Sequence, residues 1–458
     1  MQGKPYAGNP HVRFDEGAGA PRHSGRSALL YKRLIAVSLA AAGTILPAAR
    51  DAVAGFTPET SPLFEKVVEL ESGVVSYSLK YGKPSDNRQS LYFTTKSMTE
   101  DGRFLLFYHT DAEGNDEARK KPKTLMVADL QKSTVRPVAR TADGKPATGL
   151  PGYLITGEPF VETKENYIVF GTSSSGLWRC DLAEPDKARK LCDVPKELKA
   201  MGRVHSIFTH LTLTRDRRRA FLDAQVDPPG GKRRYVQGMV DLATGEFDIW
   251  GETPFNCNHG QLCPADDTLA MCAWEACWEP DGKAYKNQTG WYPRMWLVRK
   301  GWRQLIPAKE RNFASHEIWD DDGKGFSWCG LNDFVYHHDL ATGRQERWCG
   351  VERARHATIS PDNKYVVCNE CPQESYNGKR FIVRSWRAAF WNRETGKRVW
   401  ILASRPALRT EHENSPFHLC PLPRFVMDGR YIVLSAGNAD GHMDLLVTPV
   451  AQLIEKTR

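Results

Sequence analysis

Four histidines stand at one repeated position in the sequence, and they are the residues best suited to chemistry. His210, His316 and His356 each lie six residues before the aspartate of a predicted turn, and His259 fits with one extra residue. Histidine can act as a general acid or base near neutral pH, or bind a metal ion. A lone histidine on an apolar strand is more often a buried core residue. Four at one repeated position predict a shared site.

The turns belong to a repeat that must position these histidines. A turn followed by a short apolar strand recurs seven times, at residues 101–103, 165–166, 216–218, 266–267, 322–324, 362–364 and 428–430. Seven such units of four strands predict an all-β fold, a single-domain seven-bladed β-propeller. A β-sandwich is the alternative, but it does not need seven copies of one pattern. The first strand of each propeller blade lines the central channel, so the histidines should converge there. Thr95 and Leu422 hold the equivalent positions in the first and last repeats.

Basic residues accompany the histidines. Arg233, Arg234 and Arg294 lie in the same blades and could bind a carboxylate through two hydrogen bonds each, although a single arginine is more often a surface residue. The 458-residue chain carries a net charge of +8, which favours acidic partners such as an acidic polysaccharide, or simply a basic solvated surface. Nucleic acid is not expected, because the sequence has no helix-turn-helix, zinc-finger or RNA-binding signature.

Eleven cysteines are an odd number, so at least one is unpaired or pairs outside the chain. Cys368 and Cys371 have CxxC spacing, but no second CxxC follows at zinc-finger distance. Buried thiols or a few disulfides are therefore expected, rather than a structural zinc site.

The N-terminal region has the pattern of an export signal. Lys32 and Arg33 precede an apolar run at residues 34–46, and small residues follow at 52–55. An uncleaved membrane anchor is the alternative. We assign residues 1–54 to an N-terminal extension with its signal peptide and residues 55–458 to the propeller. Export to the periplasm or the medium is expected, without stable membrane insertion after cleavage. Nothing in the sequence indicates an oligomeric state.

Several segments resemble the oligogalacturonate lyase family, whose members are seven-bladed propellers. Residues 258–266, followed by Cys272, resemble the family's Gly-His segment and its following Cys-His-Glu. Residues 294–297 match an Arg-Met-Trp-Leu run, and residues 315–319 with the Asp-Gly at 322–323 resemble Thr-His-Glu-Phe-Trp and Asp-Gly. The resemblance is specific between residues 255 and 362, and it extends weakly from 60 to 450.

The family cleaves oligogalacturonides by β-elimination and uses a divalent cation, typically manganese. The resemblance implies a catalytic or substrate-binding role for His259 and a metal-ligand role for His316. It also implies a catalytic arginine before a Val-Asp-Leu-x-Thr-Gly turn, for which Arg234 is the nearest candidate and Arg233 the next.

The last blade departs from the family pattern. Where the family has Gln-x-x-His-x-His-Pro, supplying three metal ligands, this chain places Cys420 and Leu422 at the two histidine positions. His418, two residues before Cys420, is the expected replacement ligand.

Two hypotheses follow. The first is a uronate polysaccharide lyase acting on an acidic oligosaccharide. His259 or His210 would remove the C5 proton, and Arg234 or a cation held by His316 would neutralise the carboxylate. The expected substrate-binding residues are His356, Arg294 and Arg233. Metal-independent propeller lyases that act on ulvan or rhamnose-glucuronate linkages are a neighbouring class. The second hypothesis is a non-catalytic propeller that binds a glycan or a protein.

Overall fold

The computed structural model describes most of the chain after residue 54. The described residues are 55–110, 123–141, 143, 145–147, 157–253, 255–275, 294–308, 314–330, 334–351, 353–371, 374–376, 381–383, 385–406, 420–437 and 442–458. They belong to one compact unit, Val53–Arg458. The predicted extension and signal peptide at residues 1–54 lie outside the described residues. Within the described part, no helix has the length and apolar character needed to span a membrane.

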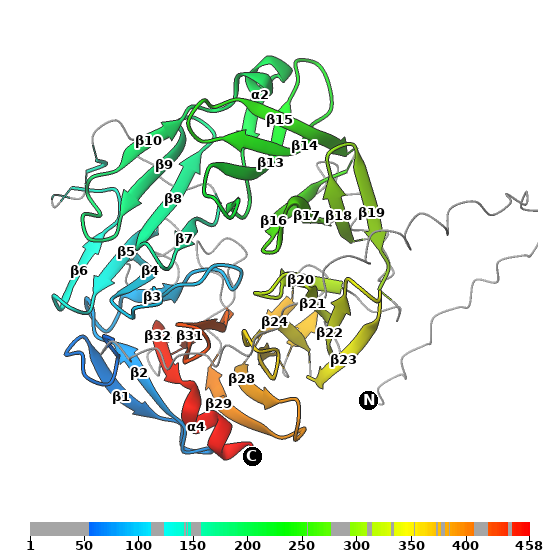
Figure 1. The fold of residues 1–458 in the computed structure, drawn as a ribbon. Coiled ribbons are helices and arrows are strands. Elements are labelled where there is room, and N and C mark those ends of the chain that lie inside the picture. The colour runs from blue at the N-terminus through cyan, green and yellow to red at the C-terminus, as the bar shows by residue number, and fades with distance from the viewer. Residues whose placement is uncertain are drawn as a thin grey trace, which may run out of the picture. The chain divides into compact units, whose positions relative to one another are not determined.

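Seven antiparallel sheets form the blades of a β-propeller (Figure 1). The first blade contains β3 (Asn87–Ser90), β4 (Phe104–Thr110), β5 (Thr124–Asp129) and β6 (Thr134–Pro137), and the second contains β7 (Phe160–Glu162), β8 (Tyr167–Thr172), β9 (Gly176–Asp181) and β10 (Arg189–Cys192). The third contains β11 (Arg203–Ser206), β12 (Thr212–Leu213), β13 (Arg219–Asp227), β14 (Arg234–Asp241) and β15 (Phe247–Thr253), and the fourth contains β16 (Cys257–Cys263), β17 (Asp266–Trp274), β18 (Met295–Arg299) and β19 (Trp302–Ile306). The fifth contains β20 (Ala314–Trp319), β21 (Gly325–Gly330), β22 (Phe334–Asp339) and β23 (Gln345–Gly350), and the sixth contains β24 (Ala354–Ile359), β25 (Tyr365–Glu370), β28 (Ser385–Asn392) and β29 (Arg398–Pro406). The predicted all-β, seven-bladed fold is confirmed.

The seventh blade joins the two ends of the propeller. It contains β30 (Arg424–Val426), β31 (Tyr431–Gly437) and β32 (Met443–Pro449), followed by β2 (Val75–Leu79) and β1 (Phe64–Val68) from the start of the domain. Tyr77 pairs with Val447 across this junction. Pairing early strands with late ones closes the ring and removes the exposed edges that an open array would leave.

Three short elements lie outside the blades. They are α2 (Lys196–Met201), α4 (Val450–Lys456) and a two-stranded hairpin of β26 (Glu374–Tyr376) and β27 (Phe381–Val383) between β25 and β28. Buried residues of α4 pack against the sixth and seventh blades.

The repeated turn is stabilised by one local arrangement of hydrogen bonds. Asp101 Oδ1 accepts from the Thr99 hydroxyl at 2.6 Å and from the Arg103 amide at 2.9 Å. Asp216 accepts in the same way from Thr214 and Arg218, and Asp362 from Ser360 and Lys364. In these three turns a hydroxyl two residues before the aspartate satisfies polar groups of the turn between the first and second strands.

One apolar cluster fills each interface between neighbouring blades. Leu106 and Phe170 belong to the cluster between the first and second blades, and Phe107 and Val433 to the cluster that joins the seventh blade to the first. Equivalent clusters occupy the five remaining interfaces. Because each blade buries both faces against its neighbours, the axis is left to the first strands and the segments that precede them.

The ten cysteines of the described part are free thiols, and all except Cys420 are buried. They follow the apolar packing of the blades, as Cys257 and Cys272 do between the third and fourth. This agrees with the expectation of buried thiols for these ten residues.

Candidate active site

The structure brings the four predicted histidines together near the axis. His259, His316 and His356 lie on the innermost strands β16, β20 and β24, and His210 precedes β12. The rings of His210 and His259 are stacked, with centroids 4.7 Å apart and an interplanar angle of 21°. The rings of His316 and His356 lie 3.9 Å apart at 53°. These four residues form what we call the histidine cluster.

Two aromatic residues from the first blade connect the two histidine pairs. The Tyr92 ring lies 5.1 Å from His210 and 5.5 Å from His356, and the Phe93 ring lies 4.9 Å from His356. Both are buried in a small axial apolar cluster that also contains Leu422. Our sequence analysis assigned neither of them a role. The only signal was their position, two and three residues before Thr95, the first repeat's counterpart of the histidines.

An uncommon backbone conformation directs two of the histidines. His259 has φ +53° and His316 has φ +57°, in the left-handed region that residues other than glycine seldom adopt. Each lies at a break in strand register, in β16 and in β20. Leu422, at the equivalent position of the last repeat, has φ +50°. A bulge of this kind re-aims a side chain, so the repeat supplies the backbone that turns these residues toward the axis.

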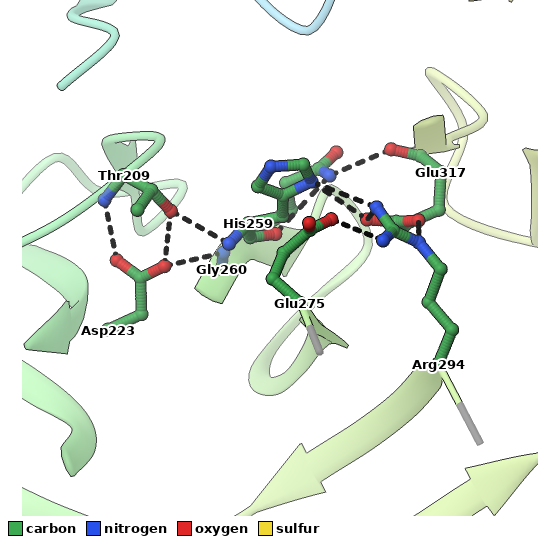
Figure 2. Close-up of polar contacts among 8 residues, drawn as sticks. Thr209, Asp223, His259, Gly260, Glu275, Arg294 and Glu317 are labelled. Carbon is green, nitrogen blue, oxygen red and sulfur yellow. Dashed lines mark hydrogen bonds and ion pairs between the residues drawn. The ribbon is translucent and has the colours of Figure 1, made fainter. Parts of the chain in front are cut away.

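A buried carboxylate holds the chain beside both members of the stacked pair (Figure 2). Asp223 Oδ1 accepts from the Thr209 amide at 2.7 Å, and its Oδ2 accepts from the Gly260 amide at 2.9 Å and from the Thr209 hydroxyl. The hydroxyl oxygen in turn accepts from the His259 amide at 2.8 Å. Thr209 precedes His210 and Gly260 follows His259, so this aspartate clamp of Asp223, Thr209 and Gly260 fixes both histidines.

Burial dominates the electrostatics of the clamp. Removal from water raises the pKa of the Asp223 carboxyl to about 6, although hydrogen bonds from Thr209 and Gly260 oppose the rise. Gly260 has no space for a side chain, because a Cβ there would lie 2.7 Å from the Phe221 ring and 3.0 Å from Asp223 Cβ. Sequence analysis missed Asp223. Its one signal is an acidic residue between the apolar residues Leu222 and Ala224 of β13.

A second set of charged groups orients the His259 ring (Figure 2). His259 Nδ1 lies 3.1 Å from Glu317 Oε1, and Arg294 Nε donates to Glu317 Oε2 at 2.8 Å. Arg294 also forms an ion pair with Glu275 through Nη1. Arg294 Nη2 lies 3.4 Å from His259 Nδ1, but a guanidinium cannot accept a proton, so we assign the Nδ1 hydrogen to the bond with Glu317.

Charged neighbours keep the buried Glu317 side chain ionised. Burial opposes ionisation of Glu317, but Arg294 and His259 hold its pKa well below the ordinary value. Two carboxylates, those of Glu275 and Glu317, then face one guanidinium, which leaves one negative charge beside the imidazole.

The other pair has an orienting partner as well. Asn369 Oδ1 accepts from the His356 amide and from its Nδ1, both at 3.2 Å. This contact orients the His356 ring beside the ring of His316.

The predicted arginines lie in three different settings. Arg294 belongs to the buried network, so it supports His259 rather than presenting a free cation to a substrate. Arg233 donates to Asp227 at 2.7 Å, and Arg234 donates to Glu252 at 2.8 Å. The structure does not bring these two to the histidine cluster, because Arg233 precedes β14 and Arg234 begins it, beyond the inner strand of the blade, and both bind neighbouring carboxylates. His418 lies outside the described residues.

No group of three or more His, Cys, Asp or Glu side chains in the described part is arranged to hold one. Leu422, which has no donor atom, is buried in the axial apolar cluster with Cys420 packed against it, and Cys420 belongs to no such ligand group in the described part. The described residues do not fit the three-ligand site that the resemblance implies.

Comparisons with known proteins agree on the fold. No protein-family model matches the chain, and no curated protein matches it. Among solved structures, an oligogalacturonate lyase in complex with manganese has a TM-score of 0.63 at 18% identity, covering 84% of this chain and 96% of that chain. An oligogalacturonate lyase from Vibrio parahaemolyticus has a TM-score of 0.63 at 16% identity, with the same coverage. At these identities the likeness shows the seven-bladed propeller arrangement.

Proposed function

We propose that this protein is a polysaccharide lyase that cleaves a uronate-containing oligosaccharide by β-elimination. The observation that carries the proposal is the His259–Glu317 pair, whose Nδ1–Oε1 distance is 3.1 Å, beside the stacked ring of His210. A carboxylate bound at Nδ1 leaves Nε2 as the proton acceptor and stabilises the imidazolium that forms. The lyase structures of the same fold support this reaction class.

In the proposed reaction His259 Nε2 takes the C5 proton of a uronate. The electron pair of the C5–H bond forms the C4–C5 double bond while the bond from C4 to the leaving oxygen breaks. His210, stacked on His259, donates a proton to that oxygen. The products are an unsaturated uronate and a shortened saccharide with a free hydroxyl.

The substrate carboxylate must be neutralised for its C5 proton to become acidic. We assign this role to the His316–His356 pair, with His356 oriented by Asn369. One similar solved structure is a complex with manganese, which supports a divalent cation as the cofactor of a lyase of this fold. Such a cation would supply positive charge to the substrate carboxylate. The described residues form no three-ligand set for it, so the mechanism assigns no step to it.

One observation favours the neighbouring substrate class. Leu422 is buried against the axis at the position of a family histidine ligand, with Cys420 packed beside it. This supports a metal-independent lyase of the ulvan or rhamnose-glucuronate type as the second candidate. The signal-like pattern at residues 32–55 supports export, which would place the enzyme beside an extracellular polysaccharide.

The test is an ultraviolet absorbance assay for the unsaturated product. The purified protein is incubated with oligogalacturonate, ulvan and glucuronan oligomers, with manganese and with a chelator. His259→Ala should lose turnover, while His205→Ala, an exposed histidine on β11, should keep it. Absence of product from every substrate under both conditions would refute the proposal. Activity that depends on manganese would refute the neutralising role of His316 and His356.

A further inference from the structure

A groove between the third and fourth blades has the composition of a ligand site. It has a volume of about 270 Å³, and its lining includes Trp250, Trp296 and Trp302 with Gln237, Glu252 and Arg303. These residues come from β14 and β15 of the third blade and from β18 and β19 of the fourth. None of its lining residues belongs to the histidine cluster or its supporting network.

One tryptophan of the groove is accessible to solvent, and the other two are held in place by neighbouring aromatic rings. Trp302 is 45% exposed, the only aromatic among the exposed large hydrophobic residues of the described part. Trp250 is buried, with its ring 5.3 Å from that of Phe221, and the Trp296 ring lies 5.5 Å from that of Phe255. Flat apolar surface is therefore held in place by packing behind it, while one indole remains accessible.

A buried donor in the same groove lacks a partner. Gln237 is 1% exposed, and its Nε2 forms no hydrogen bond within the described structure. Leaving such a donor unsatisfied costs about 1–3 kcal/mol, so an acceptor in the groove would recover that energy. The strand register breaks beside Gln237, where Trp250 is the extra residue of β15. This bulge places the donor and the indole on the same groove.

The rim adds polar and positively charged groups. Arg303 Nη1 donates to the Glu252 carbonyl oxygen at 2.8 Å, and the Glu252 carboxylate pairs with Arg234. Two guanidinium groups therefore accompany one carboxylate. A ligand with hydroxyl groups, or with a carboxylate, can bind at such a rim.

We propose that this groove is a second, non-catalytic binding site for a sugar ring of a glycan chain. The apolar C–H face of a pyranose stacks on the negative face of an indole, and a ring hydroxyl accepts from Gln237. A purely aliphatic ligand would pack on the indoles but leave the buried amide without an acceptor, whereas a sugar supplies both an apolar face and hydroxyl acceptors. The assignment does not depend on the elimination chemistry, because it rests on the groove alone.

The experiment is isothermal titration calorimetry on the full chain carrying His259→Ala, which removes turnover. The two probes are a neutral cello-oligosaccharide and an acidic oligogalacturonate. Added to this background, Trp302→Ala and Gln237→Ala should each weaken binding of one or both saccharides at least about tenfold, equivalent to about 1.4 kcal/mol. Leu70→Ala, which removes a 96% exposed side chain far along the sequence, should leave affinity unchanged.

The two saccharides distinguish a site for any pyranose ring from a site for uronates. Weakened binding of both saccharides supports a site for pyranose rings in general, and weakened binding of the acidic one alone supports a uronate site at the arginine rim. Trp302→Tyr keeps an aromatic face and should retain most of the affinity, with unfolding temperature recorded for every variant. If neither saccharide binds at millimolar concentration, or if Trp302→Ala binds as tightly as Leu70→Ala, the proposal is wrong. Neither result bears on the proposed lyase activity, which the absorbance assay on the unmodified protein tests separately.

Discussion

Replacing Asp223 with asparagine should loosen the stacked histidine pair and change how stability depends on pH. The carboxylate accepts two backbone N–H groups and one hydroxyl, from Thr209 and Gly260. Asparagine has one acceptor oxygen, and its NH₂ group must face one of the two N–H groups. One buried donor then loses its partner, which costs about 1–3 kcal/mol.

The pH dependence has the opposite sign to that of an ordinary salt-bridged aspartate. Burial raises the pKa of Asp223 from 3.8 to about 6, so between these values the folded protein binds the proton and the unfolded chain does not. The free energy of unfolding contributed by this group therefore falls as the pH rises through that window. About two pKa units correspond to about 3 kcal/mol. Asparagine does not titrate. The loss of unfolding free energy caused by Asp223→Asn should therefore be smaller at pH 7 than at pH 4, by up to about 3 kcal/mol.

The assays are urea unfolding at both pH values and the lyase rate. Displacing a catalytic group by about 1 Å can cost about 100-fold in rate, so kcat should fall by roughly that factor with a smaller change in KM. Asp216→Asn is the matched control, since Asp216 is an exposed turn residue of the same blade. An equal deficit at both pH values, together with an unchanged kcat, would refute the clamp.

Three further predictions concern the same network and its surroundings. Glu317→Gln should destabilise the fold by about 3–5 kcal/mol in urea unfolding, because it leaves buried Arg294 short of a partner. Since the Glu317 pKa is depressed in the folded state, the stability it contributes is present at neutral pH and lost in acid, and a deficit that persists unchanged in strong acid would contradict this. Arg234→Ala should change the free energy of unfolding by less than about 1 kcal/mol and leave kcat on short oligomers intact, because its ion pair is solvent-exposed. A large loss of kcat would instead support the catalytic role of Arg234 that the family resemblance implies. Gly260→Ala should cost about 1–3 kcal/mol and lower kcat, because its Cβ meets the Phe221 ring at 2.7 Å, and a fully active variant would show that β16 has room for a side chain there.

The fold was predictable because the repeat is encoded locally. Asp101, Asp216 and Asp362 each accept from a hydroxyl two residues earlier, so in these turns the hydroxyl–aspartate spacing is visible in the sequence. Counting back from those turns located His210, His259, His316 and His356. The same rule failed to find the axial residues of the first blade, because Tyr92 and Phe93 lie in an irregular segment between β3 and β4.

The supporting residues of the site could not be found in this way. Asp223 acts through Thr209 and Gly260, which are separated from it along the chain and joined only by the fold. Arg234 was chosen because it stands near a motif in sequence, but sequence proximity does not show how far a strand lies from the axis. Arg294 was expected at the substrate, yet two glutamates enclose it, which only their three-dimensional arrangement reveals.

The most direct measurement is a crystal structure of the His259→Ala protein with an unsaturated or slowly cleaved oligouronate bound. We predict a uronate at the axis, with its carboxylate against His316 and His356. Its C5 atom should lie about 3–3.5 Å from the position that His259 Nε2 occupies in the unmodified protein. A saccharide bound only elsewhere, or one at the axis with C5 turned away from residue 259, would contradict the account.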